Sequence, residues 1–333
     1  MSRTGRDVLR RGSGLPAAAW GLAATAALAM AGFLADPYTL SAWTRILSLG
    51  LLAVSVAVLA GTAGLPSLGQ VAPYAVGAYT TAILARHGIT TGPVQLAAAA
   101  TAAAMFCLPI GVAVARTRGI TFLMATLAVG ELTAVAAGQW TTVTGGTDGL
   151  AGIPATRPWW GAAPLVEDRA VYGYALTVAV AVTAAVWWTL RAPAGLLLHG
   201  CRDHETRMRA SGHPVTRYLV AAYVGAGAVA GIGGALLVTG QRYVSPGDVG
   251  FEMSALVLLA VTIGGGRSLG GALAAVALVA LVRDWAAATV PGRGPLLLGA
   301  LFIAAVYVLP DGLAGLGRRR RPRPPVEAEV PSS

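Results

Sequence analysis

Long apolar runs separated by short charged segments are the feature that most constrains how this chain can fold. Of its 333 residues, 56% are hydrophobic and only 11% are charged, whereas a soluble domain carries about 25% charged residues. A helix that crosses the bilayer core needs about 20 apolar residues, and runs of this kind cover most of the sequence. The chain is therefore predicted to be an all-α, polytopic membrane protein.

Ten candidate spans follow from the hydropathy pattern. They cover residues 16–34, 45–62, 71–86, 94–115, 119–138, 170–190, 218–239, 251–265, 268–286 and 296–310. The eighth is short, and the ninth follows it after the glycine-rich stretch 264–268, so this pair is alternatively one broken or re-entrant unit. Eight spans is the main alternative to ten. The arginines that precede the first apolar run resemble those of a signal peptide, but the length of this run favours an uncleaved first helix.

The arginines predict how the chain is oriented. All 24 basic residues are arginines, and most of them fall between alternate spans. Because arginine marks the cytoplasmic side of membrane proteins, both termini are predicted to be cytoplasmic, which requires an even number of spans. Residues 1–15 then form a cytoplasmic arm, 16–316 the transmembrane domain and 317–333 a disordered Arg/Pro-rich tail. The net charge of +10 is assigned to this orientation and not to nucleic-acid binding.

Two long loops interrupt the transmembrane domain. Residues 139–169 lie on the extracytoplasmic side, and residues 191–217 lie on the cytoplasmic side, where they form the most charged internal segment. We expect the cytoplasmic loop to contain one helix whose apolar side lies on the membrane or in a groove of a soluble partner. That apolar side contains Leu196, Leu197, Leu198 and Met208.

Motifs for catalysis or metal binding are absent from the sequence. It contains no HExxH, GxSxG or Walker A pattern and no spaced Cys/His cluster. The two cysteines, Cys107 and Cys201, have neither metal-ligand nor CxxC spacing, so we expect no disulfide, metal or cofactor. The sequence therefore indicates that the chain is not itself an enzyme.

The stretch 64–73 predicts a broken helix inside the membrane domain, and a second break is predicted at 263–271. Glycines, prolines and polar side chains interrupt the apolar pattern at both places. Irregular backbone is tolerated in a membrane only where it is buried in protein or lines a water-filled cavity. The candidate residues for such a pathway are Ser67, Gln70, Tyr74 and Tyr79. The alternative is a plain turn, with Ser67 as the N-cap of the next helix.

Charged and small residues within the spans give three further expectations. Glu131 lies inside a span, where an unpaired charge costs several kcal/mol, so it is either a pathway residue or a partner in a helix-packing hydrogen bond. Arg283 and Asp284 are expected to pair with each other near an interface. The GxxxG spacing of Gly227 and Gly231 predicts a close helix–helix crossing.

Several segments together resemble the LivM-type permease subunits of branched-chain amino acid ABC transporters. The similar segments are SLGQVAPYAVGAYTTA (67–82), RTRGITFLMATLAVGEL (116–132), TGGTDGLAGIP (144–154), RDHE (202–205), YVSPGDVGFEMSALVLLAVTIGGGRSLGGALAA (243–275) and LPDGLAGL (309–316). Each is weak alone, but they occur in the family's order. The resemblance implies a multi-pass import permease in the cytoplasmic (inner) membrane of a bacterium.

The same resemblance implies partners and a coupling site. Two cytoplasmic ATPase subunits, a second homologous permease and an extracytoplasmic substrate-binding protein are the expected partners, and ATP is hydrolysed on the partner subunits. The loop 191–217 corresponds to the segment that docks on the ATPase, where Arg202, Asp203, Glu205 and Gly212 match the family pattern. Three leucines after Gly195, together with Arg207 and Arg209, depart from that pattern.

The cargo implied by the resemblance is a branched-chain or other small hydrophobic amino acid. A urea or short-amide ABC permease is an alternative, because such cargo is also found in the family. An ion-coupled secondary transporter with Glu131 as its proton site is a further alternative.

Overall fold

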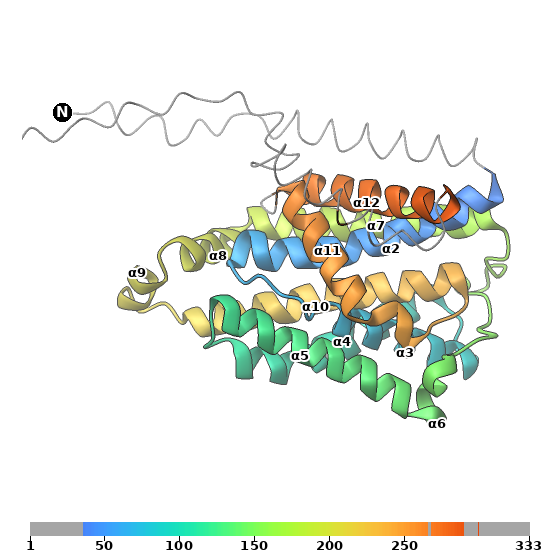
Figure 1. The fold of residues 1–333 in the computed structure, drawn as a ribbon, viewed down its shortest axis with the longest axis horizontal. Coiled ribbons are helices and arrows are strands. Elements are labelled where there is room, and N and C mark those ends of the chain that lie inside the picture. The colour runs from blue at the N-terminus through green and yellow to red at the C-terminus, as the bar shows by residue number, and fades with distance from the viewer. Residues whose placement is uncertain (1–35, 266–267, 290–298, 300–333) are drawn as a thin grey trace, which may run out of the picture.

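The computed structural model describes residues 36–265, 268–289 and 299. This part of the chain is built from helices and has no β-strand, only two isolated bridges that join Thr91 to Arg157 and Leu150 to Val244. The helices are α2 (Pro37–Ala57), the π-helix η1 (Val58–Ala63), α3 (Val71–Arg86), α4 (Gly92–Val114), α5 (Gly119–Gln139), α6 (Thr141–Thr144), the 3₁₀ helix η2 (Gly146–Asp148), α7 (Asp168–Arg191), α8 (Pro193–Asp203), α9 (Glu205–Ala210), α10 (Val215–Gln241), the 3₁₀ helix η3 (Pro246–Val249), α11 (Phe251–Gly264) and α12 (Leu269–Thr289) (Figure 1).

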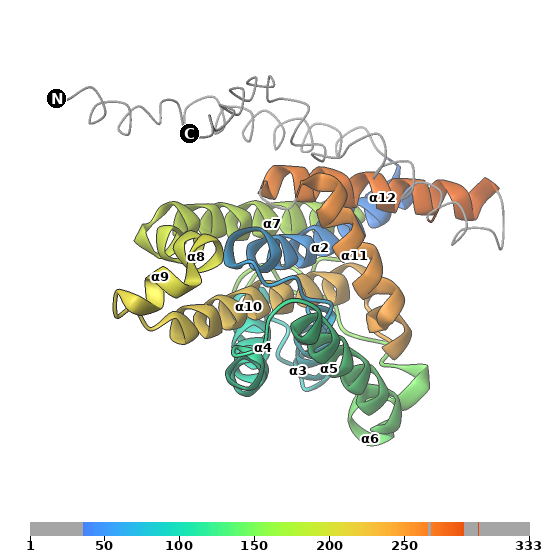
Figure 2. The same ribbon diagram turned by 60° about the vertical axis from the view of Figure 1, so that its left-hand side comes forward.

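Helix α10 lies at the centre of the bundle. It packs most extensively on α4, α3 and α2, and α2 in turn packs on α7, α11 and α12 (Figure 2). Small residues allow these crossings. A Cβ atom added at Gly77 of α3 would lie 2.2 Å from the carbonyl oxygen of Gly231 on α10, and one at Gly227 would lie 2.3 Å from Cys107 Sγ on α4. The close crossing predicted from the Gly227–Gly231 spacing is therefore confirmed.

The predicted helical segments correspond to observed helices wherever the structure describes them. The eight predictions from 45–62 to 268–286 match α2 with η1, α3, α4, α5, α7, α10, α11 and α12, mostly within a few residues at each end. The segments 16–34 and 296–310 lie outside the described residues. Six helices in the described part are long and apolar enough to cross a membrane. The total of ten spans and the cytoplasmic termini remain predictions.

Both predicted helix breaks occur. At the first, α2 widens into the π-helix η1 and ends at Gly64, whose φ of 71° is left-handed; the backbone is then non-helical until α3 begins at Val71. At the second, α11 ends at Gly265, with a φ of 78°, and α12 begins at Leu269. A left-handed residue stops a helix, and glycine adopts this conformation without steric cost.

Two expectations about charged segments are wrong. The loop 191–217 contains two short helices, α8 and α9, instead of one, because His204 has extended φ (−145°) between them. Met208 consequently packs on Gly200, although eight residues of continuous helix would separate them by about 12 Å. Arg283 pairs with Glu252 (3.8 Å), and Asp284 pairs with Arg45 (2.5 Å). Adjacent residues do not face each other on a helix, which explains this exchange of partners.

Candidate functional site

The first helix break is buried and is anchored to α5. Ser67 and Gln70 are each 1% exposed. The backbone N–H of Leu68 donates a hydrogen bond to Thr126 Oγ1 at 3.3 Å, and a Cβ atom added at Gly69 would lie 2.4 Å from the Thr126 carbonyl oxygen. The break is therefore surrounded by protein, which is the condition under which irregular backbone is tolerated within a membrane.

Ser67 does not cap α3. Its hydroxyl accepts a hydrogen bond from the N–H of Gly69 at 3.2 Å, two residues along, which forms a local turn. The N-cap position is occupied by Gln70, whose side chain makes no capping bond. The alternative interpretation of this stretch as a turn capped by Ser67 is thus wrong in its choice of cap.

The polar side chains of α3 have different surroundings. Tyr74 is hydrogen-bonded to Ser48 on α2 (2.7 Å between oxygens), and Ser48 donates to the carbonyl oxygen of Gly233 on α10 at 2.8 Å. Gln70 Oε1 accepts a long hydrogen bond from Ser55 at 3.5 Å. Gln70 Nε2 and the Tyr79 hydroxyl are buried without a partner among the described residues. A buried donor without an acceptor is costly, so these two groups are the polar atoms of this region whose bonding capacity the described residues leave unused.

The four candidates at the break and on α3 do not converge on one point. Nine helical positions separate Gln70 from Tyr79, which places them about half a turn apart around the helix axis and on opposite sides of it. Tyr74 is committed to the Ser48 hydrogen bond. The structure therefore places Ser67 and Gln70 at the break but leaves Tyr79 as a separate polar group within the hydrophobic core.

Glu131 lies on α5, one residue after Gly130, which faces Leu68 of the break. The Glu131 side chain is exposed and makes no hydrogen bond or ion pair with any residue that the structure describes. Its exposed neighbours on α5 are apolar, with Leu132 69% and Val135 56% exposed. This carboxylate therefore sits on an otherwise apolar outer surface of the bundle, beside the helix that supports the break.

An arginine–carboxylate cluster organises the α8–α9 loop. Arg118, just before α5, donates two hydrogen bonds of 3.0 Å to the carboxylate of Glu205. Arg209, one turn along α9, donates to Glu205 Oε1 at 2.9 and 3.1 Å. The hydrogen bonds from Arg118, followed by those from Arg209, hold the pKa of Glu205 below its ordinary value and outweigh partial burial, which acts in the opposite direction.

Two glycines shape the ends of this loop. Gly212 has a φ of 81°, and the bonds Gly212 N–H to Arg209 O and His213 N–H to Met208 O form a Schellman motif that ends α9. A Cβ atom added at Gly195 would lie 1.8 Å from the carbonyl oxygen of Leu190. Only glycine allows α8 to approach the end of α7 this closely. Gly212 is thus structural, and it fixes where the charged loop turns back to α10.

Arg202 connects the loop to the helix break. Its guanidinium donates a hydrogen bond to the carbonyl oxygen of Gly61 in the π-helix η1. Its aliphatic stem packs on Gly64, where an added Cβ atom would lie 2.8 Å from Arg202 Cγ. Asp203 lies 3.9 Å from the Arg202 Nε atom and is half exposed. Arg202 is therefore a direct polar contact between α8 and the end of η1.

Comparison with known proteins assigns the chain to a family. A family described as "Branched-chain amino acid transport system / permease component" matches residues 38–306. This chain belongs to that family. It is 32% identical over 296 residues to the high-affinity branched-chain amino acid transport system permease protein LivM of Salmonella typhimurium, covering 80% of this chain and 68% of the relative. The Escherichia coli LivM protein is also 32% identical, over 311 residues, covering 85% and 70%. No solved structure matches the chain.

The sequence-based prediction missed both arginines that bind Glu205. Arg118 lies within a segment that resembles the family, but its pairing with Glu205 is not predicted from the sequence. Arg209, noted only as a departure from the family pattern, is the second partner of Glu205. The signal available for Arg209 was its i, i+4 spacing from Glu205, which places the two side chains on one helix face. Both cysteines are buried and free.

Proposed function

We propose that this chain is the permease subunit of an ATP-driven importer of branched-chain or other small hydrophobic amino acids in the cytoplasmic membrane of a bacterium. Family membership and the LivM relatives support the cargo and the transport role. The observation that carries the mechanism is the contact of Arg202 with the end of η1. The expected partners are two ATPase subunits, a second permease and an extracytoplasmic binding protein.

The proposed orientation places α8 and α9 in the cytoplasm. They lie at one end of the bundle, whereas α6 lies at the opposite end (Figure 1). Arg116, Arg118 and the arginines of 191–217 gather at the α8–α9 end, as the positive-inside rule requires of a cytoplasmic end. The same rule supports cytoplasmic termini and an even number of spans, with which the proposed total of ten is consistent.

The α8–α9 unit is proposed to dock on an ATPase subunit and to move with it. The Glu205 cluster ties α9 to the segment just before α5, because Arg118 of that segment and Arg209 of α9 hold the same carboxylate. When ATP binding on the partner shifts α8, Arg202 transmits the shift to the carbonyl group of Gly61. The break would then change its packing against α5, which alters access to Gln70. The chain itself hydrolyses nothing in this mechanism.

Glu131 is proposed to face the second permease or a water-filled path between the two subunits. Its apolar neighbours indicate that lipid would otherwise surround a carboxylate, at a cost of several kcal/mol. The change Glu131→Gln keeps the shape and removes the charge. In the proposed importer it leaves ATP-driven uptake within about twofold, whereas Glu131→Leu disturbs assembly with the second permease. A loss of uptake in Glu131→Gln that follows an ion gradient would favour the secondary-transporter alternative.

Purification of the tagged full chain from mild detergent, followed by mass spectrometry, tests the proposed function. Two ATPase subunits, a second permease and a binding protein are the expected co-purifying proteins, and the binding protein is then screened with branched-chain amino acids, urea and short amides. A binding protein that takes only urea or amides would change the cargo and keep the mechanism. Purification of the chain alone, with uptake driven by an ion gradient without ATP, would contradict the proposal.

A further inference from the structure

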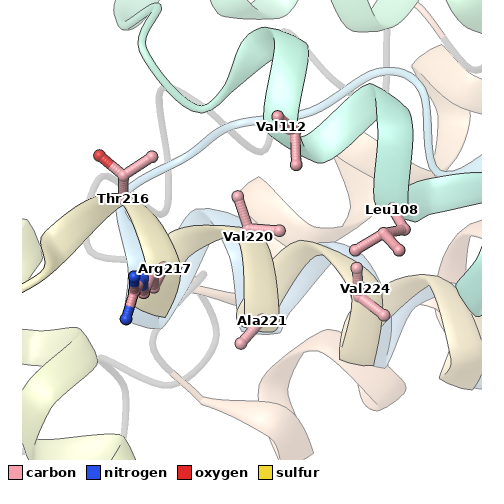
Figure 3. Close-up of a pocket in the computed structure, with 7 residues that line it drawn as sticks. All are labelled: Leu108, Val112, Thr216, Arg217, Val220, Ala221 and Val224. Carbon is pink, nitrogen blue, oxygen red and sulfur yellow. The ribbon is translucent and has the colours of Figure 1, made fainter.

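A shallow groove runs along the surface between α4 and α10, away from the helix break. The side chains that line it are Leu108, Val112, Thr216, Arg217, Val220, Ala221 and Val224. Figure 3 shows Val112 of α4 and Val220 of α10 pointing toward one another, with Leu108 and Val224 facing each other further along. Leu108 is 51% and Val112 57% exposed. The groove therefore has an apolar floor that no described residue covers.

Arg217 lies at the end of this groove where α10 begins. It is the third residue of α10 and is exposed. Its side chain makes no hydrogen bond or ion pair within the described part of the chain, whereas the side chains of Arg118, Arg202 and Arg209 at the same end of the bundle are all engaged. Thr216 provides a hydroxyl group beside it. One end of the apolar groove thus carries a free cation.

The dimensions of the groove match the upper part of a phospholipid. Seven residues separate Arg217 from Val224, which corresponds to about 10 Å along α10. The apolar residues on both walls belong to helices that are long and apolar enough to span a membrane. Arg217 therefore lies at the level where a helix emerges from the hydrocarbon, and Val224 lies at the level of the acyl chains.

The charge around Arg217 favours an anion. The segments 116–118 and 191–217 together contain seven arginines and two carboxylates. Glu205 is held by Arg118 and Arg209, and Asp203 lies beside Arg202. Neither carboxylate of these two segments is left to neutralise Arg217. A lipid headgroup whose phosphate is not offset by an ammonium group complements this charge better than a zwitterionic one.

We propose that the α4–α10 groove binds an anionic phospholipid from the membrane leaflet on the α8–α9 side of the bundle. The Arg217 guanidinium donates hydrogen bonds to the lipid phosphate, as arginine commonly does toward phosphate oxygens. One acyl chain lies over Leu108, Val112, Val220 and Val224. The start of α10 lines the groove and follows α9 after a short turn. A bound lipid would therefore also hold the C-terminal end of the α8–α9 loop at a constant depth relative to the membrane surface.

Native mass spectrometry of the purified full chain tests this site with two probes, phosphatidylglycerol and phosphatidylcholine of identical acyl chains. The wild type is expected to bind the first phosphatidylglycerol at least about fivefold more tightly than phosphatidylcholine. Arg217→Gln is expected to abolish this preference. The matched control is Arg116→Gln, which removes an exposed arginine from the same end but outside the groove, and which keeps the preference.

A second variant distinguishes the contribution of the acyl chain to binding from that of the headgroup. Val220→Trp fills the groove and is expected to weaken binding of both lipids while Arg217 is still present. Equal losses of preference in Arg217→Gln and Arg116→Gln would overturn the proposal in favour of a diffuse basic surface. Unchanged lipid binding in both groove variants, with loss of the co-purifying second permease, would overturn it in favour of a protein occupant.

Discussion

The crossing of α3 and α10 and the α8–α9 loop are held together by opposite means. In the crossing, Gly77 and Gly231 bring two backbones so close that a single Cβ atom does not fit. In the loop, one carboxylate, Glu205, holds two arginines from different segments. Close backbone contact needs no charge and suits a region without water. Ion pairs suit a surface in water and respond to pH and salt. Packing in the interior is therefore expected to respond to added volume, and the loop to changes of charge.

The largest expected effect comes from adding one methyl group to the interior crossing. Gly77→Ala places a Cβ atom 2.2 Å from the Gly231 carbonyl oxygen, so the helices must separate. We expect a loss of stability of about 1–3 kcal/mol, the range typical of overpacking. Thermal unfolding of the purified protein, followed by size-exclusion chromatography, measures this loss.

Gly138→Ala on α5 is the matched control, because an added Cβ atom there meets nothing within 4 Å. It is expected to keep the wild-type melting temperature. Equal melting temperatures for the two variants would show that the α3–α10 crossing tolerates extra volume and would remove the contrast between interior and loop.

A smaller effect is expected when the loop loses its central carboxylate. Glu205→Gln removes the charge that Arg118 and Arg209 share, and we expect a local destabilisation of about 1 kcal/mol for this partly exposed cluster. Hydrogen exchange of α8 and α9 should increase while that of α3 and α10 stays unchanged. Faster exchange in α3 and α10 as well would mean that the loop and the interior are one cooperative unit.

The same cluster predicts how loop stability depends on pH. The pKa of Glu205 is lowered in the folded protein, so the unfolded state takes up a proton first as the pH falls. The stabilisation is complete above the pKa of a glutamate in the unfolded chain, which is about 4.3. It is lost as the pH falls through the lower pKa of Glu205 in the folded protein. Exchange protection of α9 should decrease below about pH 4.3 in the wild type but change less in Glu205→Gln. Parallel curves for the two proteins would contradict this assignment.

The smallest effect is expected from one interior hydrogen bond. Tyr74→Phe removes the bond to Ser48, which keeps its bond to the Gly233 carbonyl oxygen. Hydrogen bonds between membrane helices contribute about 0.6 kcal/mol on average, so a slight decrease in melting temperature is expected. Tyr38→Phe, at a side chain that is 84% exposed, provides the comparison. If the two variants have the same melting temperature, close packing alone accounts for the stability of the interior.

The sequence predicted local features better than contacts between distant segments. Hydropathy located the described helices, and glycines such as Gly64 and Gly265 marked where helices stop, because these signals depend on neighbouring residues only. The pairing of Arg118 with Glu205 joins residues 87 positions apart. The contact of Arg202 with Gly61 is made to a π-helix, which no residue pattern predicts. Glu131 was identified from the cost of its charge, but its exposure on an apolar face of α5 was not predicted.

Arg202 joins the α8–α9 loop to the first helix break, so it offers the most direct test of the proposed coupling. The assembled complex, with its ATPases, second permease and binding protein in proteoliposomes, allows ATP hydrolysis and amino-acid uptake to be measured together. Arg202→Gln is expected to leave assembly and ATP hydrolysis nearly unchanged but to lower uptake per ATP about tenfold, since it removes a hydrogen bond from a charged donor. Arg207→Gln, at an exposed position of α9, should keep the wild-type ratio. An unchanged ratio in Arg202→Gln would contradict the proposed path from the loop to the helix break.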